Sequence, residues 1–209
     1  MSSNIVSEYG WNTAEGPRSC DCISPRILKI LKRFDVARVL DLGSGNGALC
    51  AQLALEGYQV VGVEQDRGGV EVARKSHPQI PFYNFGVQDP VDELLGDETK
   101  FDMVVSTEVV EHLFSPHLLP KYAGGCLKDS GYLVITTPYH GYLKNLLLSI
   151  FNKWDFHHTA LWHGGHIKFW SKATLCKLLS ENGFTVVDFS GVGRVPFLWK
   201  SMVVIARKS

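Results

Sequence analysis

The residues best suited to chemistry begin with a glycine-rich stretch, Val-Leu-Asp-Leu-Gly-Ser-Gly-Asn-Gly, at positions 39–47. Gly43, Gly45 and Gly47 remove Cβ atoms where a main chain must turn sharply and approach a ligand closely. Asp41, just before the turn, can hold the loop through its amides or accept a hydrogen bond from a ligand amine. A plain strand-to-helix turn has the same composition, so the loop alone does not decide a function.

A second acidic residue follows at the spacing that a nucleoside ligand requires. Glu64 comes directly after the apolar run at 59–63, about twenty residues beyond the glycine loop. At this spacing a carboxylate reaches the two ribose hydroxyls of an adenosine, whereas the alternative is a solvated acidic loop. The glycines follow the pattern G-x-G-x-G, and a pyrophosphate seat requires G-x-G-x-x-G. The pattern therefore favours an adenosine ligand without a pyrophosphate.

The scaffold for these residues is predicted from short β-branched runs that alternate with helical stretches, the pattern of a parallel sheet with crossover helices. We predict strands at residues 38–42, 59–63, 82–85, 101–106, 131–136, 185–189 and 201–206. We predict helices at residues 47–56, 68–76, 118–127 and 172–182. The link at 190–200 is too short and too rich in Gly and Pro for a crossover helix, so the last strand should be antiparallel to its neighbour.

Composition is that of one globular domain over residues 1–209, with an N-terminal cap segment at 1–35 and an insertion, or lid, at 137–170 after the fifth strand. Hydrophobic residues make up 45% of the chain and 21 Lys+Arg balance 21 Asp+Glu, which indicates neither disorder nor general attraction to nucleic acid. The five cysteines form no paired C-x-x-C knuckles, which favours reduced thiols. We expect a cytoplasmic protein, because secretory and transmembrane signals are lacking.

Three successive motifs resemble those of class I S-adenosylmethionine-dependent methyltransferases. They are the glycine loop with Glu64, the stretch Phe-Asp-Met-Val-Val-Ser-Thr-Glu-Val-Val-Glu-His at 101–112, and Leu-Lys-Asp-Ser-Gly-Tyr-Leu-Val-Ile at 127–135. The sequence looks most like the group that contains the ubiquinone-biosynthesis O-methyltransferases. The resemblance runs over nearly the whole chain. It implies an α/β, Rossmann-like fold with a seven-stranded, mostly parallel sheet, one antiparallel strand, and helices on both faces.

The resemblance also implies S-adenosyl-L-methionine as the cofactor. The glycine loop would face its methionine moiety and Glu64 its ribose. The family often has an Asp that meets the adenine amine, but Val87 stands at that position here, so main-chain groups of Val87, Gln88 or Asp89 would supply the contact. The expected cofactor-binding residues are Asp41, Gly43, Ser44, Gly45, Gly47, Glu64, Gln65, Val87, Thr107 and Glu108.

Some relatives in that group place a divalent cation near the two glutamates and the histidine of this second motif. Glu108, Glu111 and His112 have the i, i+3, i+4 spacing that would put all three on one face of a helical turn. In the alternative, Glu108 and His112 line the cofactor pocket while Glu111 caps a turn or forms a salt bridge. We favour this alternative and assign no metal ligand.

The acceptor is expected at the carboxyl ends of the parallel strands, where ligands meet in folds of this type. Five of the chain's eight histidines lie between residues 137 and 170. A neutral histidine, with an ordinary pKa near ~6.5, is suited to removing a hydroxyl proton. We predict a catalytic base among His112, His140, His163 and His166, and acceptor contacts from Tyr9, Trp11, Tyr139, Leu147 and Trp162. Loop histidines that only hydrogen bond to main chain, or a zinc site at 158–166, are the alternatives.

The segment 141–154 has the periodicity of an amphipathic helix. Its apolar face comprises Leu143, Leu146, Leu147, Ile150, Phe151 and Trp154. Its polar face comprises Lys144, Asn145, Ser149, Asn152 and Lys153. We predict a lid that shapes an apolar acceptor pocket and makes peripheral contact with a membrane, the alternative being a helix packed permanently on the domain or in a dimer interface.

Together these patterns predict an enzyme that methylates an oxygen, or else a carbon or nitrogen, of a small apolar or aromatic acceptor. A non-catalytic S-adenosylmethionine-binding module would have the same glycine loop and Glu64, so this interpretation stays open. Methylation of protein or nucleic acid is a further alternative. The neutral charge and the lack of a basic cluster argue against nucleic acid.

Overall fold

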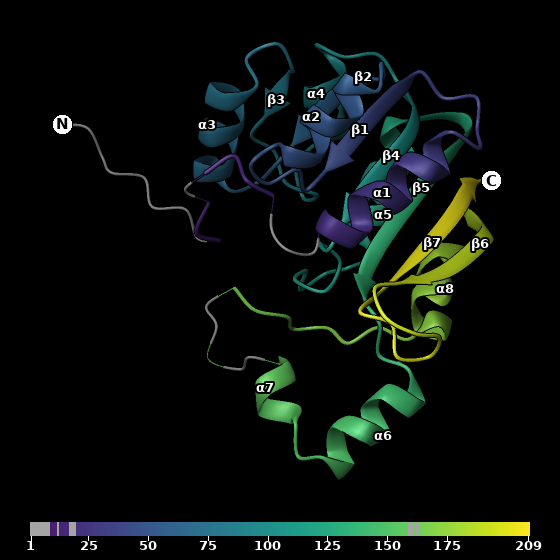
Figure 1. The fold of residues 1–209 in the computed structure, drawn as a ribbon. Coiled ribbons are helices and arrows are strands. Elements are labelled where there is room, and N and C mark those ends of the chain that lie inside the picture. The colour runs from purple at the N-terminus through teal and green to yellow at the C-terminus, as the bar shows by residue number, and fades with distance from the viewer. Residues whose placement is uncertain (1–8, 12, 17–19, 159–160, 162–163) are drawn as a thin grey trace.

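Seven strands form a single sheet in the computed structural model, which describes residues 9–11, 13–16, 20–158, 161 and 164–209. The strands are β1 (Arg38–Leu42), β2 (Gln59–Val63), β3 (Phe82–Tyr83), β4 (Phe101–Thr107), β5 (Leu127–Pro138), β6 (Phe184–Val192) and β7 (Ser201–Lys208). Their order across the sheet is β3-β2-β1-β4-β5-β7-β6 (Figure 1). Strands β1 to β5 are parallel, and β7 pairs antiparallel with both β5 and β6. The expected seven strands and the antiparallel last strand are confirmed.

Helices cover both faces of this sheet, because each central strand sends apolar side chains to both sides. The helices are α1 (Cys20–Leu31), α2 (Ala48–Leu55), α3 (Arg67–Ser76), α4 (Val91–Leu95), α5 (Leu118–Cys126), α6 (Tyr142–Ile150), α7 (Trp154–His158) and α8 (Lys172–Ser180). On β1, Val39 packs into the core beneath α1, α2 and α3, whereas Leu40 packs into the core beneath α4, α5 and α8. The predicted helices on both faces are confirmed.

Helix α1 was not predicted, since its residues were assigned to a cap segment. Pro25 lies inside this helix, and a proline normally interrupts a helical pattern. The helix forms because Ile23, Ile27 and Ile30 recur at helical spacing and are buried against the sheet and α2. Burial of this apolar stripe outweighs the single main-chain hydrogen bond that Pro25 removes.

The insertion after β5 forms a helix where periodicity placed one, but the predicted faces are wrong. Lys144, assigned to the polar face, is only 4% exposed, while Ile150 and Phe151, assigned to the apolar face, are largely exposed. The lysine is buried because its Nζ donates to the carbonyl oxygens of Tyr139, 2.8 Å away, and Lys200, 3.5 Å away. These hydrogen bonds join the start of α6 to the end of β5 and to the β6–β7 turn, so the lysine faces inward.

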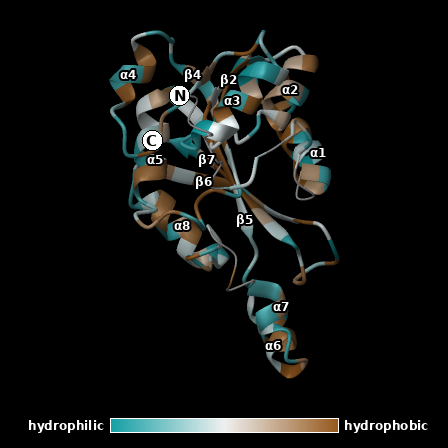
Figure 2. Cartoon of the chain, turned by 90° about the vertical axis from the view of Figure 1, so that its left-hand side faces the viewer, coloured by the Kyte–Doolittle hydropathy of each residue, from teal (hydrophilic) through white to brown (hydrophobic). Residues whose placement is uncertain are grey.

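Helices α6 and α7 extend beyond the rest of the domain, as both ribbon views show (Figures 1 and 2). Asn152 adopts a positive φ of 49° between them, which turns the chain and ends the longer predicted helix. None of the helices among the described residues combines the length and the apolar character needed to cross a membrane.

Candidate active site

A cavity of about 830 Å³ lies at the carboxyl ends of the parallel strands. One end is formed by the loops after β1, β2 and β3, and we call it the glycine-loop end. Its lining includes Gly43, Ser44, Gly45, Glu64, Gln65 and Val87. The opposite end is formed by the segment after β5 and by the β6–β7 turn, and we call it the histidine end. Its lining includes His140, His157, His158, Arg194, Lys200 and Ser201. Thr107, the last residue of β4, and Glu108, which follows it, line the cavity between these two ends.

The glycine loop needs its glycines for two different reasons. Gly43 and Gly45 have φ of 88° and 53°, and a Cβ would lie 2.3 Å from Val109 and 2.7 Å from Trp11, respectively. Gly47 also has a positive φ, 80°, but a Cβ there would meet the Phe82 ring at 2.7 Å. Gly47 therefore caps α2 against the core, and it is absent from the lining of the cavity although it was predicted to bind the cofactor.

Glu64 connects the glycine loop to the next helix. Its Oε2 accepts from the Gly45 amide at 2.8 Å and its Oε1 from the Asp66 amide at 2.7 Å. Desolvation raises the pKa of this carboxyl. Each carboxylate oxygen has a second lone pair, so a half-buried Glu64 facing the cavity can still accept two hydroxyl donors.

Two polar atoms beside this loop lack hydrogen-bond partners within the described residues. One is Oδ1 of Asp41, whose other oxygen accepts from the Cys50 thiol at 3.2 Å, and the second is Oγ of Ser44. Burial raises the pKa of Asp41 to about 7. Buried polar atoms are nearly always paired, so a ligand with amine and carboxylate groups would complete this corner of the cavity. The residues present thus fit an amino-acid moiety next to an adenosine.

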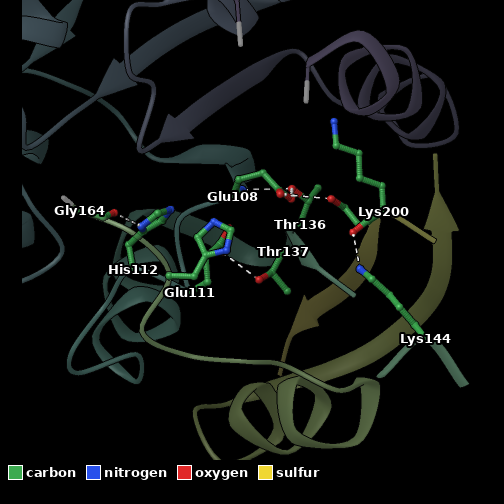
Figure 3. Close-up of polar contacts among 10 residues, drawn as sticks. Glu108, Glu111, His112, Thr136, Thr137, Lys144, Gly164 and Lys200 are labelled. Carbon is green, nitrogen blue, oxygen red and sulfur yellow. Dashed lines mark hydrogen bonds and ion pairs between the residues drawn. The ribbon is translucent and has the colours of Figure 1, made fainter. Parts of the chain in front are cut away.

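Glu108 lies between the two ends of the cavity, in a turn with φ of 55°. Thr136 donates its hydroxyl to one carboxylate oxygen of Glu108 at 2.9 Å (Figure 3). Ser201 donates its hydroxyl to the other at 3.2 Å. Burial raises the pKa of Glu108 to about 6. The helical turn that would align Glu108 with Glu111 and His112 does not form, because residues 108–112 follow β4 as a non-helical turn.

Glu111 instead comes together with two histidines. Its side chain is buried, accepts from the Thr137 hydroxyl at 2.9 Å, and has one oxygen, Oε1, without a hydrogen bond in the described chain. Nε2 of His166 lies 4.0 Å from that oxygen. Nδ1 of His112 lies 2.8 Å from the Gly164 carbonyl oxygen (Figure 3). Donor atoms of Glu111, His112 and His166 all lie within 4.8 Å of one another, so a divalent cation could be held here by a set that includes His166 and excludes Glu108.

The histidine end contains three imidazoles packed on one another. His140 stacks on His158 with ring centroids 5.5 Å apart, and His157 meets both rings edge-on at 5.9 and 4.9 Å. Burial, and then the positive charge of Lys144, lower the pKa of His140 and of His157 to about 4. Burial also lowers the pKa of His166 to about 4. These imidazoles are therefore neutral at pH 7.

Only some of the residues predicted to contact the acceptor line the cavity. Tyr9 and Trp11 line the cavity, with Tyr9 edge-on to His112 at 5.8 Å. Tyr139 turns away and packs on Trp199 at 5.1 Å, and Leu147 lines a separate hollow of about 300 Å³. Trp162 and His163 lie outside the described residues. The cavity is also lined by three residues that were not predicted from the sequence, Arg194, Lys200 and His157.

A comparison with known families matches residues 17–188 to the model of a methyltransferase domain. The chain belongs to the methyltransferase domain family. It is 30% identical over 169 residues to a ubiquinone biosynthesis O-methyltransferase of Bradyrhizobium diazoefficiens, covering 77% of this chain and 63% of that protein. A protein of the same name from Coxiella burnetii is 25% identical, with 91% of this chain and 82% of that protein covered. This methyltransferase domain thus spans somewhat under two thirds of its Bradyrhizobium relative.

Solved structures of similar fold include magnesium protoporphyrin IX methyltransferase of Synechocystis PCC 6803 with bound SAH. Its TM-score is 0.64 at 17% identity, and the match covers 90% of this chain and 80% of that one. A methyltransferase from Haloferax volcanii, solved in complex with the Trm112 activator, gives a TM-score of 0.66 at 17% identity, covering 87% and 88% of the two chains. At these identities the likeness establishes the Rossmann-like methyltransferase fold alone.

Proposed function

We propose that this protein transfers the methyl group of S-adenosylmethionine to a hydroxyl oxygen of a small acceptor with an apolar or aromatic body. The observation that carries the proposal is the glycine-loop end of the cavity. There Glu64 faces the cavity where a ribose is expected, and Asp41 and Ser44 offer unpartnered polar atoms for an amino-acid moiety. Membership of the methyltransferase domain family supports the same cofactor.

The cofactor supplies an already activated methyl group, so the protein has to orient the acceptor and remove its proton. Holding acceptor oxygen and methyl group in line can supply about 7–11 kcal/mol of the barrier. A neutral imidazole at the cavity, from His112, His140 or His166, would take the hydroxyl proton as the new oxygen–carbon bond forms. Tyr9 and Trp11 form an aromatic wall on the cavity and would exclude water from the transfer.

The first test compares ligands of the glycine-loop end. S-adenosylmethionine and S-adenosylhomocysteine are expected to bind, whereas NAD is not, because the loop has no seat for a pyrophosphate. Calorimetry with the three ligands measures this directly. NAD binding as tight as that of S-adenosylmethionine would contradict the assignment.

A panel of phenols, catechols, amines and carbon acids, with detection of S-adenosylhomocysteine, then separates an enzyme from a non-catalytic binding module. Product formed with hydroxyl acceptors supports O-methylation. A module that only binds the cofactor would give calorimetric binding without turnover against any acceptor in the panel.

Glu111, His112 and His166 also fit a divalent cation in donor type, and the unpartnered Oε1 of buried Glu111 is the observation that favours one. These residues would hold the ion, which would lower the pKa of a nearby hydroxyl. Our proposal does not require it. Turnover that disappears with a chelator and returns with a divalent ion would add the cation to the mechanism.

We also propose that α6 and α7 bring the acceptor to the cavity from an apolar phase such as a membrane surface. Support comes from the apolar side chains that these helices expose. Tyr142 is 82%, Ile150 63% and Phe156 86% exposed. Exposed apolar residues grouped on projecting helices are typical of a membrane or partner contact.

Replacing Leu147 and Ile150 with serine is expected to raise the Michaelis constant for an apolar acceptor by roughly four-fold or more. Each methylene withdrawn from apolar contact is worth about 0.8 kcal/mol. Affinity for S-adenosylmethionine should not change, because neither residue lines the main cavity. Leu55→Ser, at an 89% exposed site on α2, is the matched control. A folded double variant with unaltered acceptor kinetics would exclude α6 from acceptor binding.

A further inference from the structure

The histidine end of the cavity is positively charged. Arg194 and Lys200 line it from the β6–β7 turn, and Lys144 lies directly behind, lining the smaller hollow that it shares with Arg194. The sequence as a whole is electrically neutral, so this concentration of three cationic side chains is local. Figure 3 shows the side chain of Lys200 pointing away from Lys144, whose Nζ meets the main chain.

Lys144 has no carboxylate within ion-pair distance among the residues that the structure describes. Its Nζ donates to the carbonyl oxygens of Tyr139 and Lys200. The ammonium is nevertheless buried, and burial lowers its pKa to about 8. A buried charge without a counterion is costly, because a carbonyl dipole offsets less of the lost hydration than a carboxylate would.

Glu108, in the lining of the cavity, is within electrostatic range of Lys144 and Lys200, whose positive charges act against the rise of its pKa on burial. Thr136 and Ser201 donate to its two oxygens, and burial raises its pKa to about 6, so at neutral pH it supplies one negative charge beside three cationic side chains. The remaining groups that face the cations are imidazoles. Burial, and then the charges of Lys144 and Arg194, lower the pKa of His157 to about 4, so this imidazole is neutral at pH 7 and can donate or accept a hydrogen bond.

Arg194 is held in an unfavourable main-chain conformation, with φ of 103°. A non-glycine residue with positive φ is strained by about 1–3 kcal/mol, and such strain gathers at ligand sites. The conformation places Arg194 where the main cavity and the smaller hollow meet, since it lines both. Strained main chain and an excess of positive charge thus coincide at one end of the cavity.

We propose that the methyl acceptor bears an anionic oxygen group, a carboxylate or a phosphate, which Arg194 and Lys200 bind at the histidine end of the cavity. This inference rests on the proposed function and specifies its acceptor class. An anion placed there would receive charge-assisted hydrogen bonds from both side chains and would offset the excess of positive charge at this end of the cavity. Lys144 is a positioning residue in this arrangement, because it holds the main chain of Lys200 and does not line the main cavity.

The test uses the full chain saturated with S-adenosylhomocysteine, and benzoate and its neutral isostere benzamide as probes. Benzoate is expected to bind at least about ten-fold more tightly than benzamide, because only benzoate forms charge-assisted hydrogen bonds. Arg194→Gln and Lys200→Gln should each lower benzoate affinity by about ten-fold and leave benzamide affinity unchanged. Arg67→Gln, at an exposed site on α3 that pairs with Glu71, is the matched control and should change neither.

Three further measurements could contradict the proposal. Failure of S-adenosylhomocysteine to bind wild-type protein would refute the proposed function, whereas equal affinities for benzoate and benzamide with that binding intact overturn only the inference. If folded Arg194→Gln and Lys200→Gln lose affinity for S-adenosylhomocysteine, these two side chains bind the cofactor's own carboxylate. That result also overturns the inference. The inference is likewise overturned if these variants keep their affinity for benzoate but no longer sediment with phosphatidylglycerol–phosphatidylcholine vesicles. The anion bound by Arg194 and Lys200 would then be a lipid headgroup.

Discussion

Replacing the essential histidine with glutamine is expected to lower kcat by about 10²- to 10⁴-fold, the contribution of a well-placed general base, without weakening S-adenosylmethionine binding. The candidates are His112, His140, His163 and His166. Of the described three, all line the cavity, and none is part of the glycine-loop end. Glutamine keeps the hydrogen-bonding capacity of the side chain but cannot take up a proton, so kcat should fall while the affinity measured by calorimetry stays constant.

The pKa of the catalytic histidine sets the pH range over which kcat rises. His140 and His166 have pKa values lowered to about 4, so each is deprotonated and able to accept a proton at neutral pH. A base is active only when deprotonated, so kcat should rise with pH through about 4 and reach a plateau well below the ordinary histidine value of ~6.5. The profile is measured as single-turnover rate against pH.

His117→Gln is the matched control, because His117 is exposed and lies outside the cavity. Full activity in all four candidate variants would remove histidine base catalysis from the mechanism. Lost activity in the His112 and His166 variants together with sensitivity to a chelator would instead indicate that these imidazoles hold a cation with Glu111.

The sequence predicts best those features that depend on residues close together along the chain. The glycine loop, the strand that precedes it and Glu64 fall within one strand–helix–strand unit, so their spacing alone fixes their relation. The lining of the glycine-loop end by Gly43, Ser44, Gly45 and Glu64 follows from that unit. Helix α6 was predicted for the same reason, because helical periodicity is a local property.

Features that depend on distant partners were not predictable in this way. The burial of Lys144 requires a carbonyl oxygen 56 residues away, at Lys200, and no periodicity indicates that contact. The approach of His166 to Glu111 depends on the segment after β5, which folds back against the turn that follows β4. Arg194 and Lys200 lie in a turn that was interpreted only as a hairpin connection, and the register of β6 with β7 brings that turn to the cavity.

Glu64→Ala is expected to weaken S-adenosylmethionine binding by about 1.5–3 kcal/mol, or roughly 10- to 150-fold, through the loss of charge-assisted hydrogen bonds to the ribose hydroxyls. The carboxylate also accepts from the Gly45 and Asp66 amides, so alanine removes two loop contacts in addition to the ligand contact. Glu64→Gln separates these roles, because its amide oxygen can still accept one loop amide while the negative charge is lost.

Calorimetry with S-adenosylhomocysteine measures both variants against Glu71→Ala, an exposed carboxylate on α3 that pairs with Arg67. The glutamine variant should lose affinity by an intermediate amount and the control should lose none. Because Glu64 is desolvated and its pKa is raised, part of its interaction with a ligand requires ionisation, so wild-type affinity should also fall on acidification while that of the glutamine variant stays nearly level. Unchanged affinity in folded Glu64→Ala would show that the ribose does not bind at this carboxylate and would overturn the assignment of the whole glycine-loop end.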